Sequence, residues 1–204
     1  MLTKNQISIV KYSVFLLCLL PLARLIFLGV LQDFPANEIE FIERSTGFWA
    51  LIILLATLSL TPIRLLTGHT WPLQMRRMLG LFMFFYACLH VLIYLWLDFS
   101  FSWTDITQDI AKHPRILVGF AAFVLTVPLA ITSNKAMIKR LRERWKKLHQ
   151  LVYAVAILAV VHFWWLVKID IREPLLYALI LALLLAVRIY FKYQRAQAIK
   201  PKIN

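Results

Sequence analysis

The sequence contains few glycines and few cysteines, and both shortages limit what the protein can do. Its five glycines are spread singly and none belongs to a G-x-G motif, so the chain has no glycine-rich loop for a dinucleotide. The two cysteines, Cys18 and Cys88, lie in separate apolar segments, which indicates packing rather than a disulfide framework. Any reducing equivalents that the protein handles are therefore expected to arrive from another molecule.

Charged residues are also scarce, and this shortage indicates whether the protein is surrounded by water or by lipid. Only 16% of the 204 residues are charged and 61% are apolar, whereas soluble domains have about 25% charged and about 45–50% apolar residues. The composition predicts an integral membrane protein. The net charge of +13 does not indicate binding to nucleic acid, because the basic residues gather at the ends of apolar segments.

Six apolar segments are each long enough to cross a bilayer core, which needs about 20 helical residues. They cover residues 9–31, 46–66, 78–97, 116–133, 148–167 and 174–191. The first segment is longer than the apolar part of a signal peptide, which has about 7–15 residues, and we interpret it as a retained helix. No internal repeat is evident and no soluble stretch is long enough for a second domain. We therefore predict a single transmembrane domain over residues 1–204, an all-α bundle of six helices.

Basic residues are distributed unequally between the two sides of this bundle. Of the 23 Lys and Arg residues, Arg24 lies inside the first segment, and 17 lie at the termini and in the loops after the second and fourth segments. The opposite side has only five, which are Arg44, Lys112, Arg115, Lys168 and Arg172. The positive-inside rule therefore places both termini in the cytoplasm. Nine of the ten acidic residues lie on the outer side, and Glu143 is the exception.

The longest loops cover residues 98–115 on the outer side and 134–147 on the inner side. Seven cations lie between Lys135 and Lys147. Such a segment suits the anionic headgroups of membrane lipid, and docking of an acidic cytoplasmic partner is the alternative.

Three histidines lie inside predicted spans, where ionisable side chains are usually functional. His90 lies fourteen residues after Arg76, and His162 lies sixteen residues after Lys146, each counted from the start of its span. Both spans run in the same direction, and at a rise of about 1.5 Å per residue the two depths differ by about 3 Å. Two imidazoles at one depth can bind a single haem iron. The alternative is a structural role in which the rings bond backbone carbonyls.

His149 lies thirteen residues before His162, about 20 Å lower along the axis, where a second haem is one interpretation. The alternative is an ordinary residue of the membrane boundary beside Lys146 and Lys147. The facing position of the third span holds Arg76, whose guanidinium is a poor iron ligand but can pair with a haem propionate. On an ideal helix His149 and His162 point about 140° apart, which calls for cofactors on different sides or a local distortion of the helix. His69 and His113 lie in or near loops and are expected to be solvated.

Three motifs resemble the ferric-reductase-like transmembrane family. They are Arg76-Arg77-Met78-Leu79-Gly80 leading to His90, Ala130-Ile131-Thr132-Ser133-Asn134, and Trp145-Lys146-Lys147-Leu148-His149 leading to Tyr153 and His162. More closely, nearly the entire chain is similar to the haem-binding membrane subunits of bacterial protein-methionine-sulfoxide reductase systems.

This resemblance implies a multi-pass cytochrome b of the bacterial inner (cytoplasmic) membrane. It implies one or two haem b groups, iron linked to His90, His149 and His162, and FMN as an associated cofactor to which no residue is assigned. Larger relatives usually have paired histidines on both helices, and Arg76 departs from that pattern.

The resemblance also implies the redox partners. Electrons would come from the quinone pool or a cytoplasmic flavin reductase and pass to a periplasmic molybdopterin enzyme that reduces methionine sulfoxide in proteins. The chain itself would then be an electron-transfer subunit of an oxidoreductase system, and no catalytic residue is expected in it.

Two other functions are considered. One is a quinol-linked or ferric-reducing cytochrome b that works without the sulfoxide reductase partner. The other is a small transporter in which buried histidines relay protons. Pro21 and Pro128 interrupt predicted spans but show no two-fold pattern of the kind that many transporters have.

Overall fold

The computed structural model describes residues 3–167 and 170–199, and among these residues it contains helices and no strand. The long helices are α1 (Lys4–Leu31), α2 (Glu38–Thr67), α3 (Arg76–Ile93), α5 (Pro114–Ile131), α8 (Leu151–Leu166) and α9 (Arg172–Ile199). The short ones are η1 (Trp71–Met75), η2 (Tyr94–Asp98), α4 (Trp103–Lys112), α6 (Lys135–Leu141) and α7 (Glu143–Leu148). Lys168, Lys200 and Lys202, which are among the basic residues counted on the two sides of the bundle, lie outside the described residues.

Six stretches of the described chain are long and apolar enough to cross a membrane. Four of them are α1, α2, α5 and α9, whereas η1, α3 and η2 together form the third, and α7 with α8 forms the fifth. Many large apolar side chains lie on the surface, as expected where hydrocarbon is the solvent. The prediction of an all-α membrane protein with six spanning helices is confirmed.

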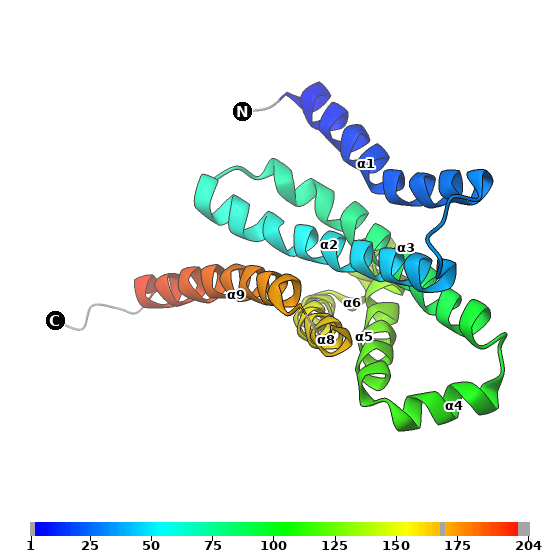
Figure 1. Cartoon of the computed structure of the whole chain (residues 1–204). Coiled ribbons are helices and arrows are strands. Elements are labelled where there is room, and N and C mark those ends of the chain that lie inside the picture. The colour runs from blue at the N-terminus through cyan, green and yellow to red at the C-terminus, as the bar shows by residue number, and fades with distance from the viewer. Residues whose placement is uncertain (1–2, 168–169, 200–204) are drawn as a thin grey trace.

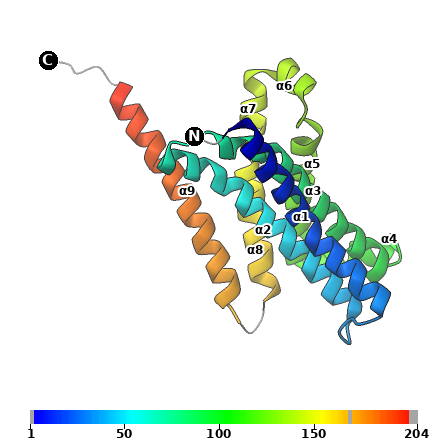
Figure 2. The same ribbon diagram turned by 90° about the horizontal axis from the view of Figure 1, so that it is seen from above.

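Two helical hairpins form the centre of the bundle. α2 packs along α3, and α5 packs along α8 (Figure 1). α9 packs against α2 and α8, whereas α1 lies on the outer side of α2 and α3 (Figures 1 and 2). The two central hairpins also contact each other through α3 and α5.

Helix α1 changes direction near its middle (Figure 1), where Pro21 lies. Proline lacks an N–H and clashes with the preceding turn, so it bends a helix. The Tyr86 hydroxyl of α3 enters this bend, where it accepts a hydrogen bond from the Leu22 N–H (3.2 Å) and donates one to the Cys18 carbonyl (2.7 Å). An undistorted helix would join these two backbone groups directly. Tyr86, which is fully buried, therefore bridges them and attaches α1 to the bundle.

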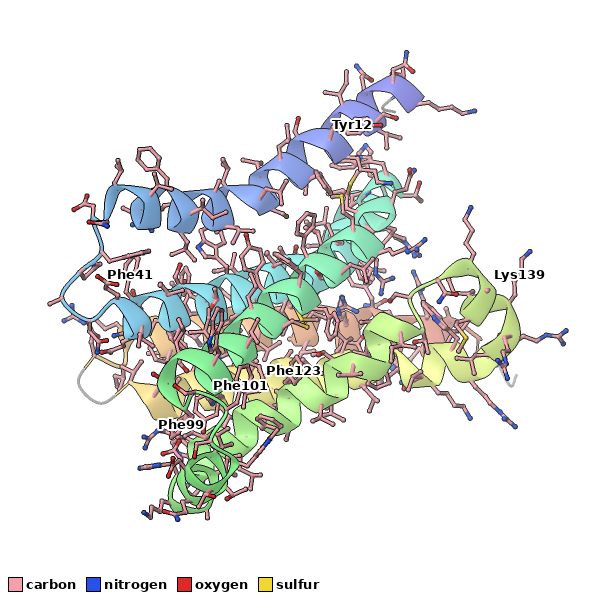
Figure 3. The ribbon with its side chains drawn as sticks, turned by 90° about the vertical axis from the view of Figure 1, so that its right-hand side faces the viewer. Tyr12, Phe41, Phe99, Phe101, Phe123 and Lys139 are labelled. Carbon is pink, nitrogen blue, oxygen red and sulfur yellow. The ribbon has the colours of Figure 1, made fainter. Side chains whose placement is uncertain are left out.

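The two ends of the bundle differ in charge. The basic end comprises residues 64–77, 134–149 and 188–195, and the acidic end comprises residues 33–43, 98–115 and 170–173. In Figure 3, Lys139 of the basic end lies far from Phe99 and Phe101 of the acidic end. The orientation of these ends in a membrane stays a prediction from the loop charges.

Both connections expected as long loops contain short helices, α4 at the acidic end and α6 with α7 at the basic end. In α4, Ile106 is only 2% exposed. Asp109 on the same helix accepts a hydrogen bond from the Tyr94 hydroxyl (2.9 Å) and contacts the His113 ring (2.8 Å). His113 is therefore partly buried and bonded rather than solvated, whereas His69 is exposed as predicted.

Candidate functional site

The structure brings together His90 of α3 and His162 of α8. Their ring centroids are 6.3 Å apart and the ring planes make an angle of 71°. Both side chains are partly buried between the two central hairpins, near the acidic end. Two histidines that are 72 residues apart in the sequence (90 and 162) therefore face each other at one depth.

One ring nitrogen of each histidine is held by a backbone carbonyl of the neighbouring helix. Nδ1 of His90 lies 3.0 Å from the carbonyl oxygen of Glu43 in α2, and Nδ1 of His162 lies 2.7 Å from that of Arg115 in α5. A carbonyl oxygen only accepts hydrogen bonds, so Nδ1 is the protonated nitrogen in both rings. Nε2 then keeps its lone pair and is the atom available to a metal.

A glycine makes room for each ring. Gly47 lies one turn after Glu43, and a Cβ at Gly47 would stand 3.0 Å from the His90 ring. Gly119 lies one turn after Arg115, and a Cβ there would stand 2.7 Å from Cε1 of His162. Residues four apart share a helix face. The carbonyl that holds each ring and the gap that admits it are therefore neighbours on one helix.

The same arrangement occurs twice with identical spacing. Each histidine follows its carbonyl residue by 47 positions, and each follows its glycine by 43, because 90 minus 47 equals 162 minus 119. The sequence shows no evident internal repeat, and nothing in its pattern sets these two glycines apart. The shared signal is small: a Gly-Phe dipeptide at residues 47–48 and again at residues 119–120.

The donor set fits a haem better than a bare metal ion. Among the described residues no group of three or more His, Cys, Asp or Glu side chains could hold a metal, and two imidazoles alone leave an ion short of ligands. A porphyrin supplies the remaining nitrogens and needs only axial ligands. His90 and His162 would hold such a group through their Nε2 atoms, and the 6.3 Å between their ring centroids leaves room for one metal centre between the two rings.

His149 has a different environment. Its ring stacks on Trp145, with centroids 3.9 Å apart, and its Nε2 lies 3.0 Å from the Thr132 hydroxyl. That hydroxyl donates to the Pro128 carbonyl (2.6 Å), so it accepts from His149 and Nε2 is the protonated nitrogen. His149 and Gln150 form the turn between α7 and α8, which is a local distortion of the helix between the two histidines of this span.

Arg76 lies near His149 and away from the His90–His162 pair. It begins α3 at the basic end, is exposed, and acts on His149 through its charge. Arg76 and His149 therefore lie at the same, basic end of the bundle, as the facing positions predicted, and at the opposite end from the facing rings. Ligation of iron by any of these residues stays a prediction.

Acidic side chains lie next to the facing histidines. The Glu43 carboxyl group, whose backbone carbonyl holds His90, lies near Asp98 at the end of η2, and burial together with that second carboxyl group raises the pKa of Glu43 to about 7. Close by, the chain forms a groove of about 550 Å³ lined in part by Asp98, Asp105 and Asp109. The surface nearest the histidine pair is thus negatively charged.

Residues 46–160 match the family described as "Ferric reductase like transmembrane component". The match covers more than half of the chain, and the protein belongs to this ferric-reductase-like transmembrane family. It is a multi-pass membrane protein.

Similar proteins in this class carry a more particular name, "Protein-methionine-sulfoxide reductase heme-binding subunit MsrQ". The relative from Herminiimonas arsenicoxydans is 46% identical over 93% of this chain and 88% of its own length. The relative from Rhodospirillum rubrum is 51% identical over 91% of this chain and 90% of its own length. The relative from Xanthomonas campestris is 55% identical over 76% of this chain and 71% of its own length. The resemblance predicted from the motifs is confirmed. No solved structure matches the chain.

Proposed function

We propose that the chain is a haem b subunit of the bacterial inner membrane that carries electrons to a reductase of protein methionine sulfoxide. The observation that carries this proposal is the facing pair of His90 and His162, in which each Nδ1 is held by a carbonyl and each Nε2 is available. The names of its relatives, which describe a haem-binding subunit of such a system, agree with the donor set.

Bound haem would supply a one-electron carrier that alternates between ferrous and ferric states. His90 and His162 would hold it through Nε2. The hydrogen bonds from Nδ1 to Glu43 and Arg115 fix the two rings and make Nε2 a stronger ligand. Packing of the two rings between the hairpins limits access of water to the site.

We further propose that electrons leave at the acidic end, towards a periplasmic molybdopterin enzyme. The acidic groove beside the histidine pair supports this, because opposite charge on a partner speeds association. The donor, either the quinone pool or a cytoplasmic flavin reductase, would act from the basic end. FMN and a second haem at His149 stay predictions, and His149 would have to leave the Thr132 hydroxyl before its Nε2 could bind iron.

A redox difference spectrum of the detergent-purified protein, with haem quantified per chain, tests the proposal. We expect His90→Ala and His162→Ala each to remove the haem, because each substitution deletes one axial ligand. His149→Ala is the matched control and should leave that haem in place. Colourless wild-type protein from haem-replete cells, or full haem content in all three variants, would overturn the assignment.

The family match also favours a second function, reduction of ferric iron. A cytochrome b of this class would then pass its electron directly to a ferric chelate. Stopped-flow oxidation of the reduced haem separates the two functions. Reoxidation by ferric chelates and not by the sulfoxide reductase would favour the ferric reductase.

A further inference from the structure

The two short helices at the basic end, α6 and α7, form a cap with a strongly positive surface. Seven cations lie between Lys135 and Lys147, and each of them is exposed. The single acidic residue of this cap, Glu143, accepts a hydrogen bond from Lys146 (2.9 Å). Within residues 3–167 and 170–199, no acidic side chain forms an ion pair with an arginine of the cap. These arginines are therefore available to an anion from outside the chain.

The cap contains an open groove of about 490 Å³ at the turn between its two helices. Arg140, Arg142 and Arg144 line the groove, together with Leu141 and Glu143. Its volume lies in the range of about 300–1,000 Å³ that is usual for small-molecule sites. Guanidinium groups pair with phosphate through two parallel hydrogen bonds. A groove lined by three arginines is therefore suited to a phosphate group.

Hydrogen bonds attach the cap to the end of α5 and hold its backbone in place. The indole N–H of Trp145 donates to the Thr132 carbonyl (3.0 Å), and Nε2 of His149 donates to the Thr132 hydroxyl (3.0 Å). At the start of α6, the Asn134 side chain accepts a hydrogen bond from the Met137 N–H (2.8 Å). A groove that is already formed loses less conformational entropy when it binds a ligand.

The position of the cap relative to a bilayer indicates the source of the phosphate. α5 has 18 residues and α8 has 16, which correspond to about 27 and 24 Å. The hydrocarbon core of a bilayer is about 30 Å thick. The cap joins the ends of these two helices (Figures 2 and 3), and we therefore expect it at the level of the lipid headgroups.

An exposed apolar side chain in the cap also favours lipid over a soluble partner. Ile138 of α6 is 41% exposed and lies between Lys135 and Lys139 in the sequence. Ile131, at the end of α5, is 63% exposed. Apolar side chains among cations are typical of segments that lie in the membrane interface. Cations alone would suit an acidic protein equally well, so these isoleucines decide between the two.

We propose that the groove between α6 and α7 binds the phosphate of an anionic phospholipid in the leaflet at the basic end. Arg140 and Arg144 would donate hydrogen bonds to the phosphate oxygens. In the orientation predicted from the loop charges this leaflet is cytoplasmic, and the cytoplasmic leaflet is the one with a negative surface potential. The proposal does not depend on whether the chain carries haem.

Native mass spectrometry of the full chain, purified in detergent, tests the site. Phosphatidylglycerol and phosphatidylcholine with identical acyl chains are added in separate titrations, and the lipid molecules retained per chain are counted. Both lipids contain a phosphate, but the choline cation neutralises it in phosphatidylcholine. We expect the wild type to retain phosphatidylglycerol at a concentration about tenfold lower, because the arginines attract its net negative charge.

Arg140→Gln and Arg144→Gln should each lower this preference about fivefold, which is the effect of one cation near a charged bilayer surface. Arg195→Gln is the matched control, since Arg195 is exposed at the basic end on α9 and the change in charge is the same. All three side chains are exposed, so the variants should unfold like the wild type. Arg142 is left unchanged, because its φ of 48° is a strained conformation for a residue with a side chain.

The outcomes separate a lipid site from a general attraction between charges. A loss of preference in Arg140→Gln and Arg144→Gln, with Arg195→Gln unchanged, supports the site. Equal losses in all three variants, or equal binding of the two lipids by the wild type, would reject it. A short poly-glutamate peptide is the probe for the other occupant. If the wild type binds this peptide and does not prefer phosphatidylglycerol, and Arg144→Gln weakens the peptide, the groove is a docking site for an acidic protein and the lipid proposal is wrong.

Discussion

At the scale of single residues, the three histidines of the spans differ in which nitrogen is held. His90 and His162 are held at Nδ1 by carbonyl oxygens, whereas His149 is held at Nε2 by a hydroxyl. In His90 and His162, Nε2 is therefore free to bind a metal, whereas in His149 the Nε2 atom already has a hydrogen-bond partner. Position along the helix is sufficient to predict that His90 and His162 share a depth, but it does not reveal which nitrogen is bonded.

The glycines beside the rings give a prediction at this scale. Gly119→Ala would place a Cβ 2.7 Å from His162, so the ring must move, and overpacking of this kind costs about 1–3 kcal/mol. We expect haem affinity to fall by about tenfold in Gly119→Ala and by less in Gly47→Ala, where the contact is 3.0 Å. Haem titration and the midpoint potential measure both effects.

Gly80→Ala is the matched control, because a Cβ at Gly80 meets nothing within 4 Å. Alanine is also a better helix former than glycine by about 1 kcal/mol, so this variant should be as stable as the wild type or more so. If Gly119→Ala bound haem as well as Gly80→Ala does, close packing of the His162 ring on α5 would be excluded.

At the scale of elements, the six spans could be predicted because hydrocarbon demands about 20 apolar residues per crossing. The short helices α4, α6 and α7 could not be predicted in this way, because they lie at the ends of the bundle and do not have to cross the hydrocarbon. The bend in α1 could be expected from Pro21. Its bridge to Tyr86 could not, because nothing in the sequence relates residues 64 positions apart.

Tyr86→Phe tests the bridge between α1 and α3. The substitution leaves the Leu22 N–H and the Cys18 carbonyl without their partner. Interhelical hydrogen bonds in membranes contribute about 0.6 kcal/mol on average and up to about 1.7, and a fully buried bridge belongs at the upper end. We expect a lower thermal unfolding temperature in detergent. Tyr12→Phe on the exposed face of α1 (Figure 3) is the control and should unfold like the wild type.

At the scale of the whole molecule, the central hairpins repeat one device, a carbonyl and a glycine on one helix and a histidine on the next. The repeat could not be predicted, because only a Gly-Phe dipeptide marks it in the sequence. The separation of charge between the ends could be predicted, because it follows directly from the loops. Together these features place the facing rings beside the acidic end.

Electron transfer to the proposed reductase should depend on this charge. Asp105 lines the acidic groove, and Asp105→Asn should slow oxidation of the reduced haem by the partner enzyme about two- to fivefold at low salt, because electrostatic steering weakens. The difference should shrink as ionic strength rises. Stopped-flow spectroscopy measures both rates. Glu143→Gln makes the same chemical change at the basic end, and an equal slowing there would contradict docking at the acidic end.

The bridge at the bend of α1 also has a consequence for biogenesis. Chains are synthesised from the amino terminus, so α1 reaches the bilayer before the residue that completes its backbone pairing, which follows 64 positions later. Unpaired peptide groups are costly in hydrocarbon. We therefore expect the backbone of α1 to stay incompletely hydrogen-bonded until α3 has entered the bilayer beside it. Until then α1 is expected to remain in contact with the translocation machinery.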